Sequence, residues 1–352
     1  MIKTTYYQDL TKMNTFGMKV KARCFMEYDS VADLVDIEFE ELARPVLHIG
    51  GGSNLLFTDD FKGTVLHSKI DFIEVLDSCD GAAEDGPVLV SVGAGVVFDD
   101  FCDWAAKEGL WGVENLSYIP GEVGAAAVQN IGAYGVEVKD VIHTVYCYDT
   151  VEEEFVSIPV EDCEYGYRDS VFKDPEIKGR YIVTHVVFAL SREPRPRLDY
   201  GHLRDAVADA AQQADLTPAL IRKVIIRIRK EKLPEPSVMG SAGSFFKNPV
   251  VSAEHFARIE ASAKAEYGAD YKVPHYDLPD GVVKVPAAWM IEQCGWKGRR
   301  SGGAAVYEKQ PLVIVNYTGE AYPEEIIGLE RRIIESVKDK FGIELHPEVE
   351  HI

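Results

Sequence analysis

The stretch HIGGGSNLLF, residues 48–57, places three consecutive glycines between a short apolar run and Ser53, Asn54 and further apolar residues. A strand followed by glycines is typical of a dinucleotide-binding fold or a phosphate-binding loop. Gly50 and Gly52 supply G-x-G, but Leu55 stands where the third glycine belongs, and no Gly-Lys-Ser/Thr follows. Neither motif fits, which leaves a tight turn that needs positive φ or a bare backbone that lies against a ligand.

A second stretch, SYIPGEVGAAAVQNIGAYG at residues 117–135, favours the ligand. Its glycines, alanines and small polar residues are too poor in bulky side chains to build a core alone, so we expect a ligand to supply the missing bulk. Two glycine-lined backbones with N–H donors would suit the pyrophosphate of a large planar nucleotide cofactor, without a helix dipole. Polar side chains beside them are Ser53, Asn54, Ser117, Gln129 and Asn130.

Composition excludes several classes of function. A length of 352 residues suggests two or three domains, and a net charge of −21 with a pI near 4.9 argues against nucleic-acid binding and polybasic membrane contact. No signal core opens the chain, and no apolar stretch approaches the roughly 18 residues of a membrane span, so we expect a cytoplasmic protein. The cysteines lack metal-site spacing and are expected to be buried thiols, with no metal bound: Cys24, Cys79, Cys102, Cys147, Cys163 and Cys294.

Hydrophobic periodicity predicts interleaved strands and helices. Alternation predicts a strand at 88–96, and β-branched and aromatic residues predict strands at 143–150 and 180–190. Helical spacing predicts helices after residue 98, from 218 to the prolines at 234 and 236, and from 323 to Gly342. Polar loops are predicted at 191–199 and in the acidic, glycine-containing turn at 77–86.

Seven motifs, taken together, resemble the UDP-N-acetylenolpyruvoylglucosamine reductase family. They occur in family order from about residue 14 to the C-terminus: NTFG, GGGSNLL, IPGEVGAAAVQNIGAYG, YGYRDS, GSAGSFFKNP, GGAAV and HPEVEHI. The resemblance implies an α+β fold with a two-part FAD-binding region, like that of vanillyl-alcohol oxidase, and a C-terminal α/β substrate-binding domain. The implied divisions are 1–75 and 76–218 for the FAD-binding subdomains and 219–342 for the substrate domain, with a tail at 343–352 that packs back on the first subdomain.

The same resemblance implies an NADPH-dependent flavoenzyme that reduces UDP-N-acetylglucosamine enolpyruvate to UDP-N-acetylmuramate for peptidoglycan synthesis. NADPH and the substrate would use one pocket in turn, and the protein is expected to be a monomer. The implied FAD contacts come from both glycine-rich stretches: Gly50, Gly51, Gly52, Ser53, Asn54, Leu55, Ser117, Ile119, Pro120, Gly121, Gly124, Ala125, Gln129, Asn130, Ile131 and Gly132.

Three residues match the family's catalytic groups. Ser244 of GSAGSFFKNP would protonate the enolate carbon, while Arg168 of YGYRDS and Glu348 of HPEVEHI would polarise the substrate carboxylate. A carboxyl beside that anion has to be protonated or hydrogen-bonded, because burial favours its neutral form. Glu122 and Glu292 match no family role and are interpreted as solvated or structural.

Six further residues match the family's substrate contacts: Lys232, Asn248, Gln293, Tyr134, Tyr167 and Tyr200. Lys232 would meet the diphosphate, whereas Lys247 is interpreted as a surface lysine. Tyr200 follows the polar SREPRPR loop and matches the mobile-loop tyrosine of the family's longer subtype, although a core aromatic residue is the alternative.

Two other functions are compatible with these motifs. A different FAD oxidoreductase on this scaffold, such as an alcohol or lactone oxidase, would not need Ser244, and its reduced flavin would consume oxygen. A catalytically dead flavin- or nucleotide-binding module would be yellow, but NADPH would not bleach it. Anaerobic bleaching followed by addition of the enolpyruvyl substrate separates all three.

Overall fold

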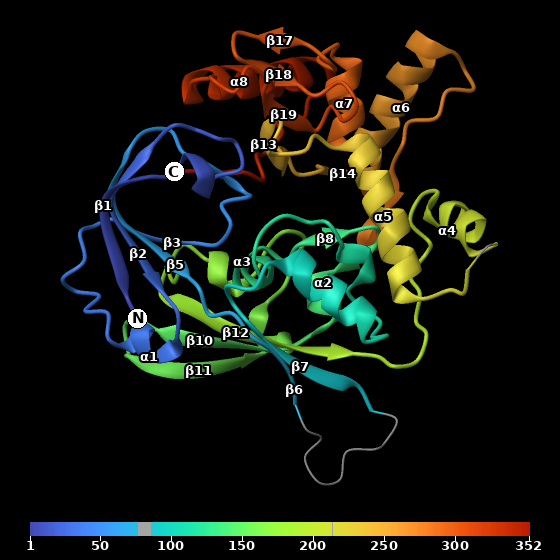
Figure 1. Cartoon of the computed structure of the whole chain (residues 1–352). Coiled ribbons are helices and arrows are strands. Elements are labelled where there is room, and N and C mark those ends of the chain that lie inside the picture. The colour runs from blue at the N-terminus through green and yellow to red at the C-terminus, as the bar shows by residue number, and fades with distance from the viewer. Residues whose placement is uncertain (77–85, 213) are drawn as a thin grey trace. The chain divides into compact units, whose positions relative to one another are not determined.

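The computed structural model describes residues 1–76, 86–212 and 214–352 (Figure 1). The predicted turn at 77–86 and Cys79 therefore lie almost wholly outside the described residues. The described chain forms two compact units. The first contains Met1–Leu10, Lys21–Gly52 and Asp60–Glu231, and the second contains Thr11–Val20, Ser53–Asp59 and Lys232–Ile352.

The first unit contains two larger sheets and a small hairpin. One sheet has the order β1-β2-β5-β3, with bounds Lys3–Asp9, Lys21–Tyr28, Phe61–Ser68 and Val46–Ile49. The other has the order β11-β10-β12-β7-β6, with bounds Glu154–Pro159, Ile142–Asp149, Tyr181–Leu190, Val88–Gly93 and Ile73–Val75. The hairpin pairs β8 (Gly132–Ala133) with β9 (Val136–Glu137). The strands predicted at 88–96, 143–150 and 180–190 are thus confirmed as β7, β10 and β12.

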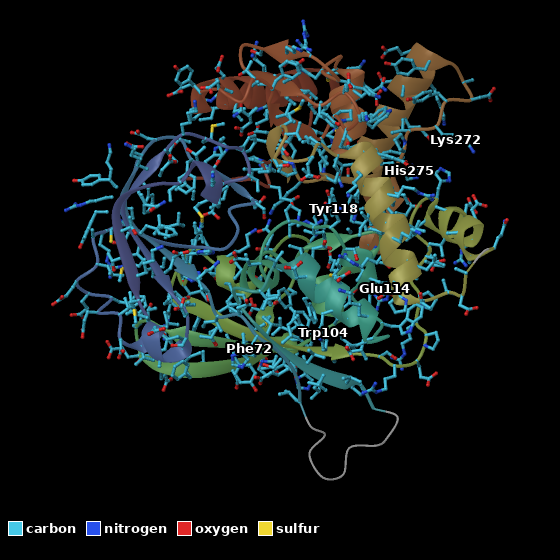
Figure 2. All side chains as sticks on the ribbon, viewed as in Figure 1. Phe72, Trp104, Glu114, Tyr118, Lys272 and His275 are labelled. Atoms are coloured by element: carbon cyan, nitrogen blue, oxygen red, sulfur yellow. The ribbon has the colours of Figure 1, made fainter. Side chains whose placement is uncertain are left out.

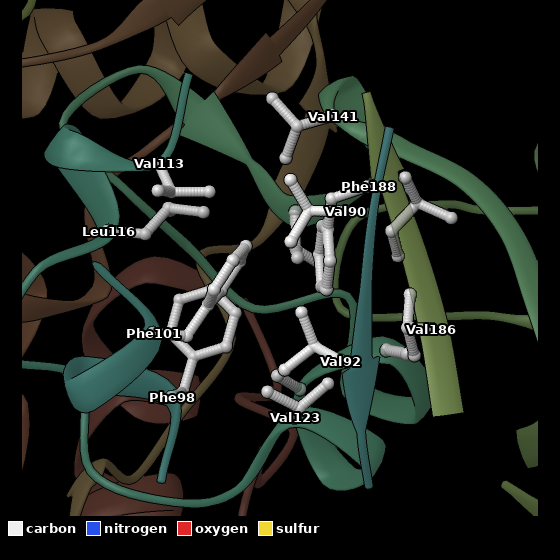
Figure 3. Close-up of a cluster of buried hydrophobic side chains, with 14 of the residues drawn as sticks. Val90, Val92, Phe98, Phe101, Val113, Leu116, Val123, Val141, Val186 and Phe188 are labelled. Atoms are coloured by element: carbon white, nitrogen blue, oxygen red, sulfur yellow. The ribbon is translucent and has the colours of Figure 1, made fainter. Parts of the chain in front are cut away.

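The main core lies between the five-stranded sheet and the helices α2 (Phe98–Lys107) and α3 (Val123–Gln129), which cover one of its faces (Figure 1). Figure 3 shows Phe98 and Phe101 of α2 pointing toward the valines of β7 and toward Phe188 of β12. The Phe101 and Phe188 ring centroids are 4.6 Å apart. The apolar stripe predicted after residue 98 is therefore the face that α2 buries.

Helix α3 corrects the interpretation of the second glycine-rich stretch. We expected this stretch to build no core alone and a ligand to supply the missing bulk; its Val123, Ala126 and Ala127 are instead buried in the main cluster, together with residues of α2 and the five-stranded sheet. Small side chains permit this close packing: a Cβ on Gly124 would lie 2.9 Å from the Cβ of Ala94. The composition that suggests a missing ligand therefore also serves close packing between a helix and a sheet.

The first unit also contains α1 (Val31–Val35), α4 (Leu203–Ala211) and α5 (Pro218–Lys232), whose last residue belongs to the second unit. The predicted apolar face of α5 is confirmed, since Ile221, Val224 and Ile225 are buried. The described thiols are free, and all but the half-buried Cys294 are buried: Cys24, Cys102, Cys147, Cys163 and Cys294.

The second unit is built around the sheet β13-β19-β18-β17, with bounds Gly240–Ser244, Val313–Asn316, Ala304–Val306 and Arg300–Ser301. A smaller sheet has the order β14-β16-β15, with bounds Val250–Ser252, Val282–Lys284 and Tyr276–Asp277. Its helices are α6 (Ala253–Tyr267), α7 (Ala287–Gln293) and α8 (Pro323–Phe341). Helix α8 packs on β18 and β19 and ends at the predicted Gly342, which has a φ of 66°. Among the described residues, no helix combines the length and the apolar composition that crossing a bilayer requires.

A half-buried histidine in β3 makes the stability of the first unit dependent on pH. The hydroxyl of Tyr28 lies 2.7 Å from Nε2 of His48, and burial, together with the nearby His67, lowers the pKa of His48 to about 4. Unfolded histidine titrates near 6.5, so the unfolded chain takes up this proton first as the pH falls. Stability from this group is therefore fully present above pH 6.5 and is lost between pH 6.5 and 4.

Replacement His48→Gln is expected to remove this acid-dependent loss, which is on the order of 2 kcal/mol for a half-buried group. The measurement is urea denaturation of the wild type and the variant at several pH values between 7 and 4. His202→Gln is the control, because the His202 side chain is almost fully exposed. A wild-type pH slope in His48→Gln would contradict the assignment of a neutral His48.

Candidate active site

The two glycine-rich stretches contact each other within the first unit. A Cβ on Gly51 would lie 3.3 Å from the Cα of Gly121, and a Cβ on Gly50 would lie 2.9 Å from the Cβ of Ala125. Gly52 adopts a φ of 61° and Gly121 a φ of 122°, both in the region that glycine favours. The positive φ of Gly52 fits the tight turn, and the close approach of Gly51 to Gly121 requires bare backbone at this place, while the contact with a ligand stays a prediction.

The loop that carries Arg168 is bound to residues that follow α3. The Arg168 guanidinium donates to the carbonyls of Asn130 (3.2 Å) and Gly132 (2.7 Å). A Cβ on Gly132 would lie 2.9 Å from Nη1 of Arg168, so the glycine leaves room for the guanidinium. These two hydrogen bonds join the Arg168 side chain to the main chain that follows α3.

Lys173 is a residue of this loop that the sequence analysis missed. Its Nζ donates to Oε1 of Gln129 and to the carbonyl of Arg168, each at 2.9 Å. Its only signal in the sequence is a position five residues after Arg168, at the end of a short apolar run. Lys173 thereby joins the loop that carries Arg168 to a residue that we expect to contact the cofactor.

Several polar side chains assigned to FAD are already bonded within the protein. The Asn130 side chain donates to the carbonyl of Gly166 at 2.7 Å and accepts from the amide of Lys139. The hydroxyl of the fully buried Ser117 donates to the carbonyl of Glu114 at 2.7 Å. Contacts from these two residues to a cofactor would therefore come from the main chain.

Tyr118 lies beside α5, which contributes two cationic side chains that contact it (Figure 2). Nε of Arg229 donates to the carbonyl of Tyr118, and Nζ of Lys230 lies 5.1 Å from the Tyr118 ring centroid. Burial lowers the pKa of Arg229 from its usual value. No motif marks these residues in the sequence, because the apolar face of α5 accounts for that helix without them.

The three tyrosines assigned to the substrate are all partly accessible. Tyr200 is 45% exposed and its ring meets Tyr134 edge-on, with centroids 6.0 Å apart. This exposure excludes the core alternative for Tyr200. The Arg168 guanidinium lies 5.3 Å from the ring centroid of Tyr167, which is 38% exposed.

In the second unit, the C-terminal tail holds Glu348 beside β13. The Glu348 amide donates to the carbonyl of Phe245 at 2.8 Å, so Glu348 adjoins the residue after Ser244. The Asn54 side chain donates to the Glu348 carbonyl at 3.1 Å, and the strand β20 (Glu350–His351) pairs with β4 (Leu55–Leu56). Ser53, Asn54 and Leu55, assigned to the cofactor, thus belong to the unit that contains Ser244 and Glu348.

A β-bulge sets the position of Ser244. The register of β13 against β19 shifts between Ser241 and Ser244, and Gly243 adopts a φ of 70°. A bulge turns a side chain away from strict alternation, which is why bulges are common near functional sites. The partly buried Ser244 ends the strand opposite Val313.

The other three residues that the sequence predicts to bind the substrate also lie in the second unit. Lys232 is exposed at the end of α5, and Oδ1 of Asn248 accepts from the amide of Ala287 at the start of α7. Gln293 ends α7, and its carbonyl accepts from Lys340. Glu292 is exposed and paired with Lys297, as expected for a solvated residue.

The residues of the first unit fit a cofactor held mainly by the main chain. The glycine turn offers backbone without side chains, and the buried Nε2 of Gln129 has no acceptor among the described residues. Gly50–Gly52, Ser117 to Gly121 and Gln129 to Gly132 would hold FAD in this unit. No group of His, Cys, Asp and Glu within the described parts of the chain could hold a metal ion.

Replacement Gly50→Ala is expected to weaken FAD binding about tenfold or more, because the new methyl group would push the turn away from Ala125. The measurement is titration of deflavinated protein with FAD, followed by flavin fluorescence. Gly328→Ala is the matched control, since a Cβ there meets no atom within 4 Å and Gly328 lies inside α8. Wild-type FAD affinity in Gly50→Ala would contradict the assignment of this turn to the cofactor.

Comparison with known proteins identifies the family. Residues 23–153 match the model of the FAD binding domain, and residues 235–352 match the model of the UDP-N-acetylenolpyruvoylglucosamine reductase C-terminal domain. The UDP-N-acetylenolpyruvoylglucosamine reductase of Bacteroides fragilis (strain YCH46) is 50% identical over 344 residues, which cover 97% of this chain and 98% of that protein. The protein of the same name from Porphyromonas gingivalis (strain ATCC 33277) is 45% identical over 348 residues, which cover 97% of each chain.

The crystal structure of UDP-N-acetylenolpyruvylglucosamine reductase from Thermus caldophilus superposes with a TM-score of 0.64 at 23% identity. The match covers 100% of this chain and 98% of that chain, so the two proteins share the same overall fold. The predicted fold class, an FAD-binding region followed by a C-terminal substrate domain, is confirmed. The chain belongs to the UDP-N-acetylenolpyruvoylglucosamine reductase family, and it is an oxidoreductase with FAD as its cofactor and NADPH as its reductant.

Proposed function

We propose that Ser244, Arg168 and Glu348 carry out the reduction of UDP-N-acetylglucosamine enolpyruvate to UDP-N-acetylmuramate, a step in the synthesis of peptidoglycan. FAD, when bound, carries the hydride from NADPH to the methylene carbon of the substrate. The neighbouring carbon must then gain a proton, and the negative charge that develops on the enolate must be stabilised. The observation that carries the proposal is the hydrogen bond from the Glu348 amide to the Phe245 carbonyl, which holds the main chain of Glu348 against the residue that follows the proposed proton donor Ser244.

Ser244 is the proposed proton donor in this scheme. A hydroxyl group is a weak acid, so it can give up its proton only when hydride transfer has made the neighbouring carbon strongly basic. The order of events is therefore hydride first and proton second. The bulge at Gly243 supports this role, because it interrupts the regular alternation of side chains just before Ser244, the last residue of β13.

Arg168 and Glu348 are proposed to polarise the substrate carboxylate. The two carbonyls that Arg168 meets fix the plane of its guanidinium, and a planar fork suits a carboxylate better than the point charge of a lysine. Glu348 would donate a hydrogen bond to the developing enolate as a neutral acid. The side-chain amide of Asn54 donates to the Glu348 carbonyl and so keeps the backbone of Glu348 in place.

Substrate and NADPH are proposed to occupy one pocket in turn, with the exposed Lys232 meeting the diphosphate that both molecules carry. The enolpyruvyl substrate is then expected to inhibit flavin reduction competitively against NADPH. The measurement is the steady-state initial rate of NADPH oxidation, with NADPH varied at several inhibitory substrate concentrations, because the substrate also reoxidises the reduced flavin. A noncompetitive pattern would mean that the two molecules bind at separate places.

We also propose that the protein is a cytoplasmic monomer. The described cysteines are free thiols, which are typical of a reducing compartment. A net charge of −21 disfavours association with nucleic acid and with anionic membranes. Equilibrium sedimentation at several protein concentrations tests the oligomeric state.

A further inference from the structure

A buried cluster of charged residues lies behind the glycine turn, and none of the proposed catalytic roles uses it. Its centre is His67 of β5, which is 3% exposed. Nδ1 of His67 lies 3.2 Å from Oε1 of Glu27, and Nε2 lies 3.0 Å from Oε1 of Glu122. Glu122 is 8% exposed, which leaves the structural one of its two interpretations, solvated or structural.

The fold brings these residues together by strand register. β2 and β5 are parallel neighbours in which Glu27 lies directly opposite His67. Glu122 immediately precedes α3, and its backbone forms a bridge with Val97. One histidine therefore connects the four-stranded sheet to the loop of the second glycine-rich stretch.

Hydrogen-bond chemistry assigns a proton to each ring nitrogen of His67. An ionised carboxylate can only accept, so a contact from each ring nitrogen to a different carboxylate requires both nitrogens to donate. Nζ of Lys3 lies 3.7 Å from the other oxygen of this carboxylate, Oε2 of Glu27. His67 is then an imidazolium held between two carboxylates, which is an arrangement that tolerates burial.

The Glu122 side chain, which His67 holds, also contacts the glycine turn. A Cβ on Gly50 would lie 3.3 Å from Oε2 of Glu122 and 3.5 Å from its Cβ, so the Glu122 side chain lies against the turn. The amide of Phe98 bonds the Gly121 carbonyl and the amide of Val123 bonds the Val96 carbonyl, which fixes the main chain on either side. His67 fixes the side chain, because a buried carboxylate without its partner would turn away to find another donor.

We propose that His67 is a positioning residue that, through Glu122, fixes the two glycine-rich stretches against each other and thereby sets the affinity of the protein for FAD. This inference rests on the proposed assignment of those stretches to the cofactor. It assigns no catalytic step to His67 or to Glu122. The two residues act before any substrate is present, so their effect belongs to cofactor binding.

The test measures FAD affinity in the variants His67→Gln, Glu122→Gln and the double variant. Deflavinated full-length protein is titrated with FAD and followed by flavin fluorescence and by the visible absorption of the bound flavin. Each single variant is expected to raise the dissociation constant for FAD at least tenfold. The double variant is expected to be no weaker than the worse single variant, because both changes remove the same bond.

Controls separate this role from general destabilisation. His185→Gln changes another histidine of the first unit, stacked on Tyr146 with ring centroids 4.3 Å apart, and is expected to keep wild-type FAD affinity. Urea denaturation of each apoprotein gives the change in stability independently of FAD. Should a single variant not fold, Glu27→Gln weakens the same chain of bonds from its other end and is expected to raise the dissociation constant by a smaller factor.

Two results would overturn the proposal. One is wild-type FAD affinity in both single variants, and the other is a double variant whose loss is the product of the two single losses. Gly50→Ala reports separately on the assignment of the turn to FAD. If Gly50→Ala weakens FAD binding and His67→Gln does not, the turn binds the cofactor but His67 does not position it.

Discussion

Replacement of Ser244 by alanine is expected to leave the reduction of bound FAD by NADPH nearly unchanged and to slow the second half-reaction by about 10²- to 10⁴-fold, the usual contribution of a positioned proton donor. Ser244 has no role in hydride transfer from NADPH to FAD, because that step does not protonate a substrate carbon. The loss should appear in the rate constant at saturating substrate rather than in the substrate concentration that gives half of that rate.

The measurement is anaerobic and uses a single turnover. NADPH bleaches the enzyme, the enolpyruvyl substrate is then added, and the return of flavin absorption gives the rate of the second half-reaction. Ser241→Ala is the matched control, since Ser241 lies in the same strand and is 3% exposed. An equal decrease in the rates of both half-reactions in Ser244→Ala would contradict the role of Ser244 as the proton donor.

The alternatives to this function predict different behaviour in the same experiment. An oxidase on this scaffold would hold its flavin reduced until oxygen is admitted, whether or not the enolpyruvyl substrate is present. An inactive flavin-binding module would not be bleached by NADPH. Family membership does not favour either alternative, because relatives that match 97% of the chain have the name of the reductase.

The helices and strands that could be predicted from the sequence are those whose apolar residues recur at a regular spacing. Helices α2, α5 and α8 have apolar faces at helical spacing, and β12 is a long run of β-branched and aromatic residues. In each case burial of one face supplies most of the stability, so the pattern of apolar residues determines the element. These elements form at the positions expected.

Helix α3 was missed for the opposite reason. Its sequence VGAAAVQ has small side chains, and the position of Gly124 against Ala94 is a matter of close approach rather than of periodicity. Composition alone cannot distinguish a bare backbone that faces a ligand from one that faces a sheet. Both uses occur within one stretch here, since Gly121 meets Gly51 while Ala127 is buried in the core.

The site residues divide in a similar way. Motifs found Ser244, Arg168 and Glu348, but the groups that hold them in place gave no comparable signal. Lys173 and the carbonyls of Asn130 and Gly132 act through main-chain geometry, which side-chain identity does not record. Glu122 was interpreted without knowledge of His67, because strand register creates that pair and the two residues are far apart in sequence.

Replacement Arg168→Lys is expected to slow the second half-reaction by about 10²- to 10³-fold and to weaken substrate binding. The Arg168 guanidinium bonds the carbonyls of Asn130 and Gly132 through two different nitrogens, at 3.2 and 2.7 Å. A lysine ammonium is a single charged centre, so it cannot reproduce both contacts and also present a planar pair of donors to a carboxylate. The positive φ of 55° at this position affects lysine and arginine alike, so backbone strain does not contribute to the difference.

The measurement is again the single-turnover return of flavin absorption, now at several substrate concentrations, so that binding and rate are separated. Arg180→Lys is the matched control, because Arg180 also makes a two-nitrogen contact in the first unit, with the carboxylate of Asp149 at 2.9 and 2.6 Å. That variant is expected to lose some stability and to keep both half-reactions. A wild-type rate at saturation in Arg168→Lys would mean that the guanidinium only anchors its loop, because a charge that stabilises the enolate must affect the rate of the bound complex.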